Sequence, residues 1–131
     1  SEMCIRDRHT FVNKNNSGIT STLVYTVEGD NVIKQTAQNV ADPEILNATP
    51  EDVKSFIEEK YKGYNGLKGV KQTIEIKDGK VVQDLEVDFS VASISELRKA
   101  LPEEYSGIGN RVSFSNSKKA LEKMGFTEKT N

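Results

Sequence analysis

The chain has 131 residues, a length typical of one domain, and such a domain buries roughly two thirds of the surface that its unfolded chain exposes. Its net charge is −2, from 18 basic and 20 acidic residues that are interspersed, so it lacks the clustered Lys and Arg that nucleic acids and anionic membranes attract. No apolar run approaches the ~18 residues of a membrane helix, and a single Cys excludes an internal disulfide and a multi-Cys zinc site. We expect a soluble monomer with no nucleic-acid partner.

Residues 1–8 differ in pattern from the rest of the chain. The segment Ser1-Glu2-Met3-Cys4-Ile5-Arg6-Asp7-Arg8 lacks the hydrophobic periodicity of the later residues, and it resembles a translated sequencing-adaptor fragment. We interpret it as a non-native tail, which leaves a single α+β domain over residues 9–131.

Three strands are expected in the first third of the chain. Phe11 and Val12 indicate the first, the alternating β-branched stretch from Ile19 to Val27 the second, and Val32 to Val40 a weaker third. A turn at residues 28–31 joins the last two. These segments predict a three-stranded antiparallel meander.

A helix should begin at Pro50. Thr49 is suited to the N-cap, Pro50 to the first helical position, and the two acids after it to the positive end of the helix dipole. A stripe at helical spacing comes next and predicts the buried face of a helix that ends at Gly63 or Gly66. Its members are Val53, Phe56, Ile57, Tyr61 and Tyr64. The two tyrosines could line a pocket, but their spacing favours a place in the core.

The stretch from Val70 to Phe89 predicts a β-hairpin. Two alternating runs flank Asp78-Gly79, which can adopt the positive φ angles of a type I′ turn. That turn fixes the register and separates the side chains into two faces. The face expected to be buried carries Val70, Gln72, Ile74, Ile76, Val81, Gln83, Leu85, Val87 and Phe89. The opposite face is charged, so we expect one side of the sheet to face water.

Two further helices are expected near the C-terminus. Ser93-Ile94-Ser95-Glu96 is a capping-box pattern that opens a short helix to Leu101, stopped near Pro102. Residues 103–114 are expected to be loop, with a possible short strand over residues 111–114. Ser115 or Ser117 should cap a last helix that turns Ala120, Leu121 and Met124 inward, stops at Gly125 and packs Phe126 back. The predicted fold is a two-layer α+β sandwich, an antiparallel sheet of about five strands with helices on one face.

The sequence contains few of the residues that common catalytic mechanisms need. His9 is the single His, and without a second His or a Cys in the body the usual Ser-His and Cys-His mechanisms lack an essential residue. Asp84, Glu86 and Asp88, which we call the acidic stripe, suggest a calcium site. Residues two apart on a strand are about 6.6–6.8 Å apart, whereas Ca²⁺ needs oxygens within about 2.3–2.6 Å, so a solvated face is favoured. We expect no catalytic residue, no metal and no cofactor.

Several stretches resemble the YehR-like family of small bacterial lipoproteins of unknown function. They are Ser21 to Asp30 leading to Val32–Thr36, Leu67 to Val70 running into the hairpin, Leu85 to Phe89, and the closing Ser117 to Phe126. The resemblance covers about residues 9–130. It implies an α+β two-layer domain held outside the cytoplasmic membrane by a diacylated N-terminal Cys. Ser1-Glu2-Met3 before Cys4 departs from the lipobox pattern, so Cys4 is not expected to carry the lipid.

The expected function is therefore that of a non-enzymatic cell-envelope domain that binds a protein or a small ligand. Its expected location is extracytoplasmic, with membrane attachment only through a lipid anchor that this chain lacks. Two alternatives remain. One is an enzyme that uses carboxylates such as Asp84 and Glu86, and the other is a purely structural envelope component.

Overall fold

A computed structural model describes residues 6–14 and 17–130 of the chain. Over these residues it has a six-stranded sheet with the order β4-β5-β3-β2-β1-β6, in which each neighbouring pair is antiparallel. The strands are β1 (Arg6–Lys14), β2 (Ile19–Glu28), β3 (Asn31–Ala41), β4 (Val70–Lys77), β5 (Lys80–Asp88) and β6 (Thr127–Lys129). The helices are α1 (Pro43–Leu46), α2 (Pro50–Lys60), the 3₁₀ turn η1 (Lys62–Tyr64), α3 (Ile94–Ala100), α4 (Pro102–Tyr105) and α5 (Phe114–Lys123).

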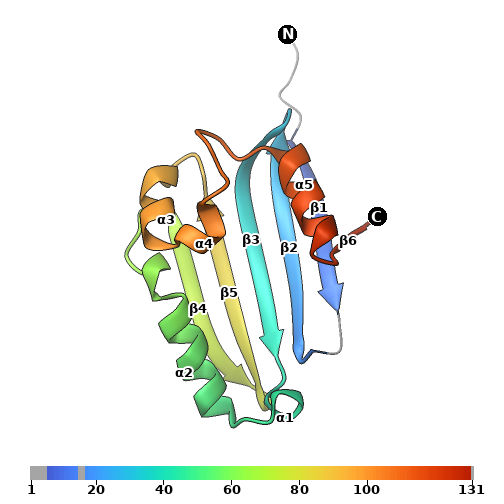
Figure 1. Cartoon of the computed structure of the whole chain (residues 1–131), viewed down its shortest axis with the longest axis vertical. Coiled ribbons are helices and arrows are strands. Elements are labelled where there is room, and N and C mark those ends of the chain that lie inside the picture. The colour runs from blue at the N-terminus through green and yellow to red at the C-terminus, as the bar shows by residue number, and fades with distance from the viewer. Residues whose placement is uncertain (1–5, 15–16, 131) are drawn as a thin grey trace.

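The helices lie on one face of the sheet, as expected for a two-layer α+β fold. Figure 1 shows α2, α3 and α4 in front of β4 and β5, and α5 in front of β1 and β2. The sheet has one strand more than the five expected, because β6 pairs with β1 through Thr10, Phe11 and Val12. Three residues are too few to give an alternating pattern, which is why this strand is not apparent in the sequence.

The hairpin has the register expected from its turn. Asp78 has a φ of 51° and Gly79 a φ of 79°, and Lys77 lies opposite Lys80. Gln83, Val81 and Val87 are buried on the helix side, whereas Lys71 and Thr73 are exposed on the other side. Ile76, expected on the buried face, is 40% exposed because it lies beside the turn at the end of the sheet. The sheet is therefore covered on one face only.

The core divides into three apolar clusters rather than one. Leu97, Leu101 and Tyr105 pack against β3 and β5 at one end. Phe11, Tyr25 and Leu121 form the second cluster under α5, and Val53 packs on Ala41 and Val81 to form the third under α2. This division leaves room between the helices.

Several helix boundaries differ from expectation. Thr49 caps α2 as expected by accepting a hydrogen bond from the Asp52 backbone N–H, but the helix ends at Lys60, and Tyr64 belongs to η1. Phe56, expected to be buried, is 66% exposed on α2. Segment 103–114 is also not all loop, since Pro102 starts the short helix α4 and a single β-bridge, Asn31 to Ser113, replaces the possible strand.

The proposed tail overlaps the first strand. Residues Arg6 to Arg8 lie in β1 opposite Thr26 to Glu28, and Arg6 Nε contacts Glu28 Oε2 at 3.2 Å. Cys4 and the rest of residues 1–5 lie outside the described residues. The non-native origin of residues 1–8 therefore stays a prediction, while the folded part begins at least three residues before residue 9.

Candidate functional site

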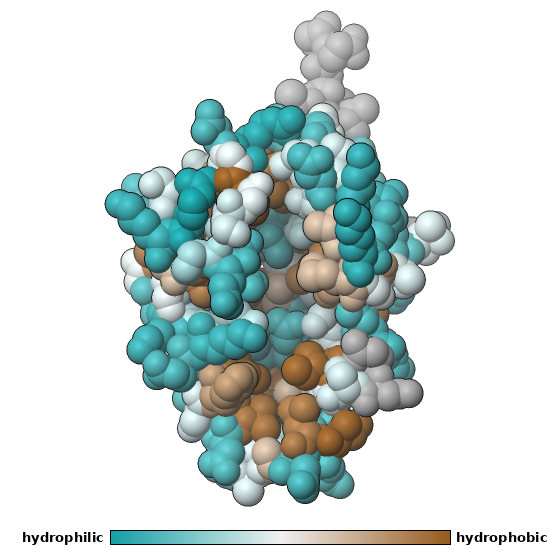
Figure 2. Space-filling view, viewed as in Figure 1, coloured by the Kyte–Doolittle hydropathy of each residue, from teal (hydrophilic) through white to brown (hydrophobic). Residues whose placement is uncertain are grey.

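A cleft of about 470 Å³ opens between the two groups of helices. Strands β2, β3 and β5 form its floor, α4 with η1 forms one wall, and α5 forms the other. Figure 2 shows this face of the molecule hollowed at that place. Because ligand sites in proteins are typically concave and of about 300–1,000 Å³, the cleft is the candidate site.

The strand register arranges the floor in rows that run across the sheet. One row contains Gln35 with Tyr25 and Val87, the next Ala37 with Leu23 and Leu85, and the third Asn39 with Ser21 and Gln83. The polar side chains of Gln35 and Asn39 thus lie on either side of Ala37 along β3. Ala37 is the small residue at the middle of the floor, and its short side chain leaves space between its two leucine neighbours.

The third row continues as a band of polar side chains across four strands, which we call the amide band: Ser21, Asn39, Gln83 and Gln72. Ser21 Oγ donates to Asn39 Oδ1 at 2.5 Å, Asn39 Nδ2 donates to Gln83 Oε1 at 3.0 Å, and Gln83 Nε2 donates to Gln72 Oε1 at 2.7 Å. Gln72 Nε2 then donates to the backbone oxygen of Tyr61 at 3.2 Å. Gln83 is only 2% exposed, so these bonds satisfy an amide that burial would otherwise penalise.

Tyrosines form the wall beside η1 and α4. The hydroxyls of Tyr64 and Tyr105 are 3.0 Å apart, and their rings meet edge to face with centroids 6.3 Å apart. Burial raises the pKa of both hydroxyls, and it raises the pKa of Tyr25 to about 12. All three are therefore neutral at physiological pH. Tyr64 is buried in the core, as expected, whereas Tyr61 is half-buried and packs against the same core cluster. Both tyrosines also line the cleft.

The other wall is the apolar side of α5. Leu121 is buried as expected, but Met124 is 60% exposed and Ala120 is exposed as well. Both line the cleft. Apolar residues at helical spacing predict a face that packs against other residues, and here that face borders the cleft instead. Gly125 ends the helix with a φ of 95°, and Phe126 packs back, as expected.

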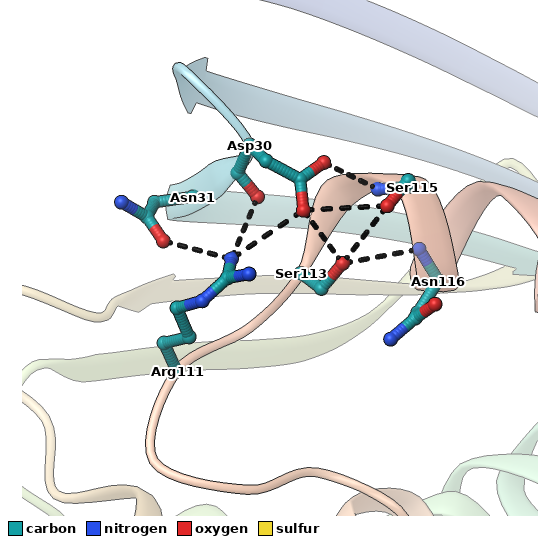
Figure 3. Close-up of polar contacts among 6 residues, drawn as sticks. All are labelled: Asp30, Asn31, Arg111, Ser113, Ser115 and Asn116. Carbon is teal, nitrogen blue, oxygen red and sulfur yellow. Dashed lines mark hydrogen bonds and ion pairs between the residues drawn. The ribbon is translucent and has the colours of Figure 1, made fainter.

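The N-terminus of α5 is fixed to the β2–β3 turn by Asp30 (Figure 3). Asp30 Oδ2 accepts a hydrogen bond from Ser113 Oγ at 2.8 Å, and Asp30 Oδ1 accepts one from the Ser115 backbone N–H at 2.9 Å. The Ser113 bond is the main cause that lowers the pKa of Asp30, followed by the Ser115 bond. Ser113, rather than Ser115 or Ser117, is the N-cap, since its Oγ accepts from the Asn116 backbone N–H.

The loop between α4 and α5 is held at two points. Arg98 of α3 donates from Nη2 to the backbone oxygens of Ile108 and Gly109. Arg111 Nη1 donates to Asn31 Oδ1 at 2.9 Å and to the Asp30 backbone oxygen at 3.2 Å. These contacts keep the upper rim of the cleft in place.

Besides Tyr25, Tyr61 and Glu104, three polar side chains in the cleft keep their hydrogen-bonding capacity. They are Gln35 on the floor and Asn116 and Ser117 on α5. Within the part of the chain that the structure describes, no hydrogen bond forms at these three side chains. They are therefore available to a ligand.

The acidic stripe lies on the opposite face of the sheet, outside the cleft. Its members have different partners: Asp84 Oδ1 accepts from Gln38 Nε2 at 3.0 Å, Glu86 lies 3.6 Å from Lys34 Nζ, and Asp88 accepts from Ser90. Over residues 6–14 and 17–130, no group of three or more His, Cys, Asp and Glu side chains is placed to hold a metal ion.

His9 is not among the residues that line the cleft. Its Nδ1 lies 2.7 Å from Glu128 Oε2, and Lys118 Nζ lies 3.1 Å from Glu128 Oε1. The cluster joins β1, β6 and α5. It places His9 in the folded domain.

One signal in the sequence marks the cleft floor. Gln72 and Gln83 interrupt the apolar face of the predicted hairpin, and an amide buried on that face must find a partner. Gln35, Asn116 and Ser117 carry no such signal, because they come from segments some 80 residues apart that only the fold brings to one cleft.

Comparison with known proteins identifies the family. The family described as "Protein of unknown function (DUF1307)" matches residues 7–127. An uncharacterized lipoprotein of Listeria innocua is 33% identical over 114 residues, which cover 86% of this chain and 74% of that protein. An uncharacterized lipoprotein of Listeria monocytogenes is 34% identical over 114 residues, with the same coverage.

Solved structures with low sequence identity share the fold. The NMR structure of the Escherichia coli YehR protein has a TM-score of 0.74 at 20% identity, covering 95% of this chain and 91% of that one. A Streptococcus pneumoniae protein has a TM-score of 0.64 at 18% identity, covering 98% and 88%. Among the described helices, none combines the length and the apolar character needed to cross a bilayer. The chain belongs to the DUF1307 family of unknown function, a YehR-like family of small proteins whose Listeria relatives are named as lipoproteins.

Proposed function

We propose that this domain binds a small ligand in the cleft, as the extracytoplasmic part of a lipoprotein, and that it does so without catalysing a reaction. The observation that carries the proposal is the cleft itself, which combines a small-residue floor at Ala37 with polar side chains that the fold leaves without partners.

The absence of catalysis is proposed from the chemistry of the lining. The polar groups that line the cleft are mainly amides and hydroxyls, which neither gain nor lose protons near neutral pH. Among the described lining residues, Glu104 is the single carboxylate. Acid–base catalysis by paired carboxylates needs two in one site, and Asp84 and Glu86 lie on the other face of the sheet.

The proposal can be tested by blocking the cleft. We would titrate ¹⁵N-labelled protein with three neutral probes in turn: di-N-acetylchitobiose, N-acetylated and C-amidated tri-alanine, and hexan-1-ol. At least one probe should shift the amide resonances of Ala37, Asn116 and Ser117. Ala120→Trp, which places a large ring in the cleft, should abolish the shift, and Lys119→Trp on the exposed side of α5 should retain it.

The folded state of each variant is checked from the dispersion of its amide resonances, and Met124→Trp serves as a second blocked variant. The proposal is wrong if none of the three probes moves the cleft resonances. It is also wrong if the shifts persist unchanged in both blocked variants.

A further inference from the structure

We infer that the ligand of the cleft is an uncharged saccharide of at least two rings; this rests on the proposed function and names the class of ligand. Four features of the cleft lead to that class: its charge, its free hydrogen-bonding groups, the hydrogen bonding of the strand backbone beneath it, and the spacing of the polar side chains on its floor.

The lining of the cleft carries little charge. Of the described residues that line it, Arg111 and Glu104 are charged. The Arg111 guanidinium is already bonded to Asn31 and Asp30, and Glu104 is exposed on α4. A phosphate or carboxylate placed on the floor would lose its hydration without gaining a partner charge, which is costly.

The free polar groups suit hydroxyls. Gln35 and Asn116 each present an amide that both donates and accepts, and the Ser117 hydroxyl does the same. A sugar hydroxyl also donates and accepts, so two adjacent hydroxyls can form hydrogen bonds with both the nitrogen and the oxygen of one amide. Ser21 and Asn39 of the amide band line the far end of the same floor, where hydrogen bonds already join them to each other and to Gln83.

The backbone of the floor is not available to a peptide strand. β2 is paired with β1 and β3, β3 with β2 and β5, and β5 with β3 and β4. Peptides that bind by adding a strand need an unpaired sheet edge. Recognition on this floor must therefore come from side chains.

A sugar ring has polar hydroxyl groups at its edge and apolar C–H groups on its faces, and the floor offers a matching surface to each. Leu23, Ala37 and Leu85 form an apolar row between the row that contains Gln35 and the polar row of Asn39. Gln35 and Asn39 are four positions apart on β3, a backbone distance of about 13 Å at about 3.3 Å per residue. That span exceeds one hexopyranose, so two linked rings are the smallest saccharide that can contact both rows while their C–H groups cover the apolar row.

The test compares neutral, charged and peptide ligands on the intact chain. We would measure affinity by NMR titration with cellobiose and di-N-acetylchitobiose, their monosaccharides, a glucuronate-containing disaccharide, and capped tri-alanine. We expect at least one neutral disaccharide to bind at the cleft resonances, more tightly than its monosaccharide and than the charged disaccharide.

Substitutions then identify the side chains that bind the disaccharide. Gln35→Ala and Asn116→Ala should each lower the affinity for the disaccharide by about three- to tenfold, the effect of losing one or two hydrogen bonds. Gln38→Ala on the opposite face of β3 and Lys119→Ala on the outer side of α5 should leave its affinity unchanged.

The failures of the two proposals are distinguishable. If capped tri-alanine or hexan-1-ol shifts the cleft resonances and no disaccharide does, the saccharide inference is wrong and the proposed function stands. If the charged disaccharide binds as tightly as the neutral one, or if the monosaccharide binds as tightly as the disaccharide, the inference is also wrong. If no probe reaches the cleft, both proposals fail.

Discussion

The amide band gives a quantitative prediction at Gln83. This side chain is 2% exposed, accepts from Asn39 at 3.0 Å and donates to Gln72 at 2.7 Å. Gln83→Met keeps a similar length and volume, removes both bonds and creates no large cavity. With each hydrogen bond worth about 0.5–1.5 kcal/mol net, the free energy of unfolding should fall by about 1–3 kcal/mol.

The assay is urea denaturation followed by circular dichroism, with the wild type and the variant compared at equal m-value. Gln38→Met is the matched control, because Gln38 is exposed on the other face and donates to Asp84 at 3.0 Å. The free energy of unfolding of the control should stay within about 0.5 kcal/mol of the wild-type value. If Gln83→Met also stays within that range, the amide band does not stabilise the sheet and our interpretation of the cleft floor is wrong.

Three further predictions concern the faces of the sheet and its carboxylates. Leu85→Ala should lower the free energy of unfolding by about 2–5 kcal/mol, while Glu86→Ala should change it by no more than about 0.5 kcal/mol, as measured by urea denaturation. Asp30 has a folded-state pKa below its unfolded value of about 3.9, so its contribution to stability is complete above that value and is lost as the pH falls through the folded-state pKa. Asp30→Asn should therefore reduce the loss of stability in acid. Millimolar Ca²⁺ should not raise the melting temperature, because the members of the acidic stripe do not converge.

Each of these predictions has a result that would contradict it. If Leu85→Ala and Glu86→Ala lowered the free energy of unfolding equally, both faces of the sheet would be covered. An acid dependence that Asp30→Asn leaves unaltered would show that the bonds to Ser113 and Ser115 do not matter for stability, with Glu122→Gln, an exposed carboxylate on α5, as the control. A Ca²⁺-dependent rise in melting temperature that Asp84→Asn with Asp88→Asn abolishes would establish a calcium site.

Local signals predicted the elements whose ends are marked by their own residues. Asp78-Gly79 set the hairpin register, Thr49 and Pro50 the start of α2, and Ser93 the start of α3. In each case the deciding hydrogen bonds or φ angles lie within a few residues of the signal, so the sequence contains the needed information.

Tertiary contacts decided the features that the sequence did not predict. Ser113 outcompetes Ser115 and Ser117 as the cap of α5 because Asn31 forms a β-bridge with Ser113 and Asp30 bonds to its hydroxyl. Met124 has the spacing of a core residue, yet it is 60% exposed at the edge of the cleft. The periodicity of a helix shows which side is apolar, but it does not show whether that side meets a packed neighbour or a cleft.

The central claim is that the cleft holds a ligand, and the most direct measurement is of contacts between the two. We would record intermolecular NOEs between ¹³C-labelled protein and an unlabelled neutral disaccharide, chosen as the one that binds most tightly. We predict NOEs from sugar protons to the methyl groups of Ala37 on the floor and Ala120 on α5. NOEs confined to methyl groups on the open face, such as those of Val24 and Thr36, would contradict the claim.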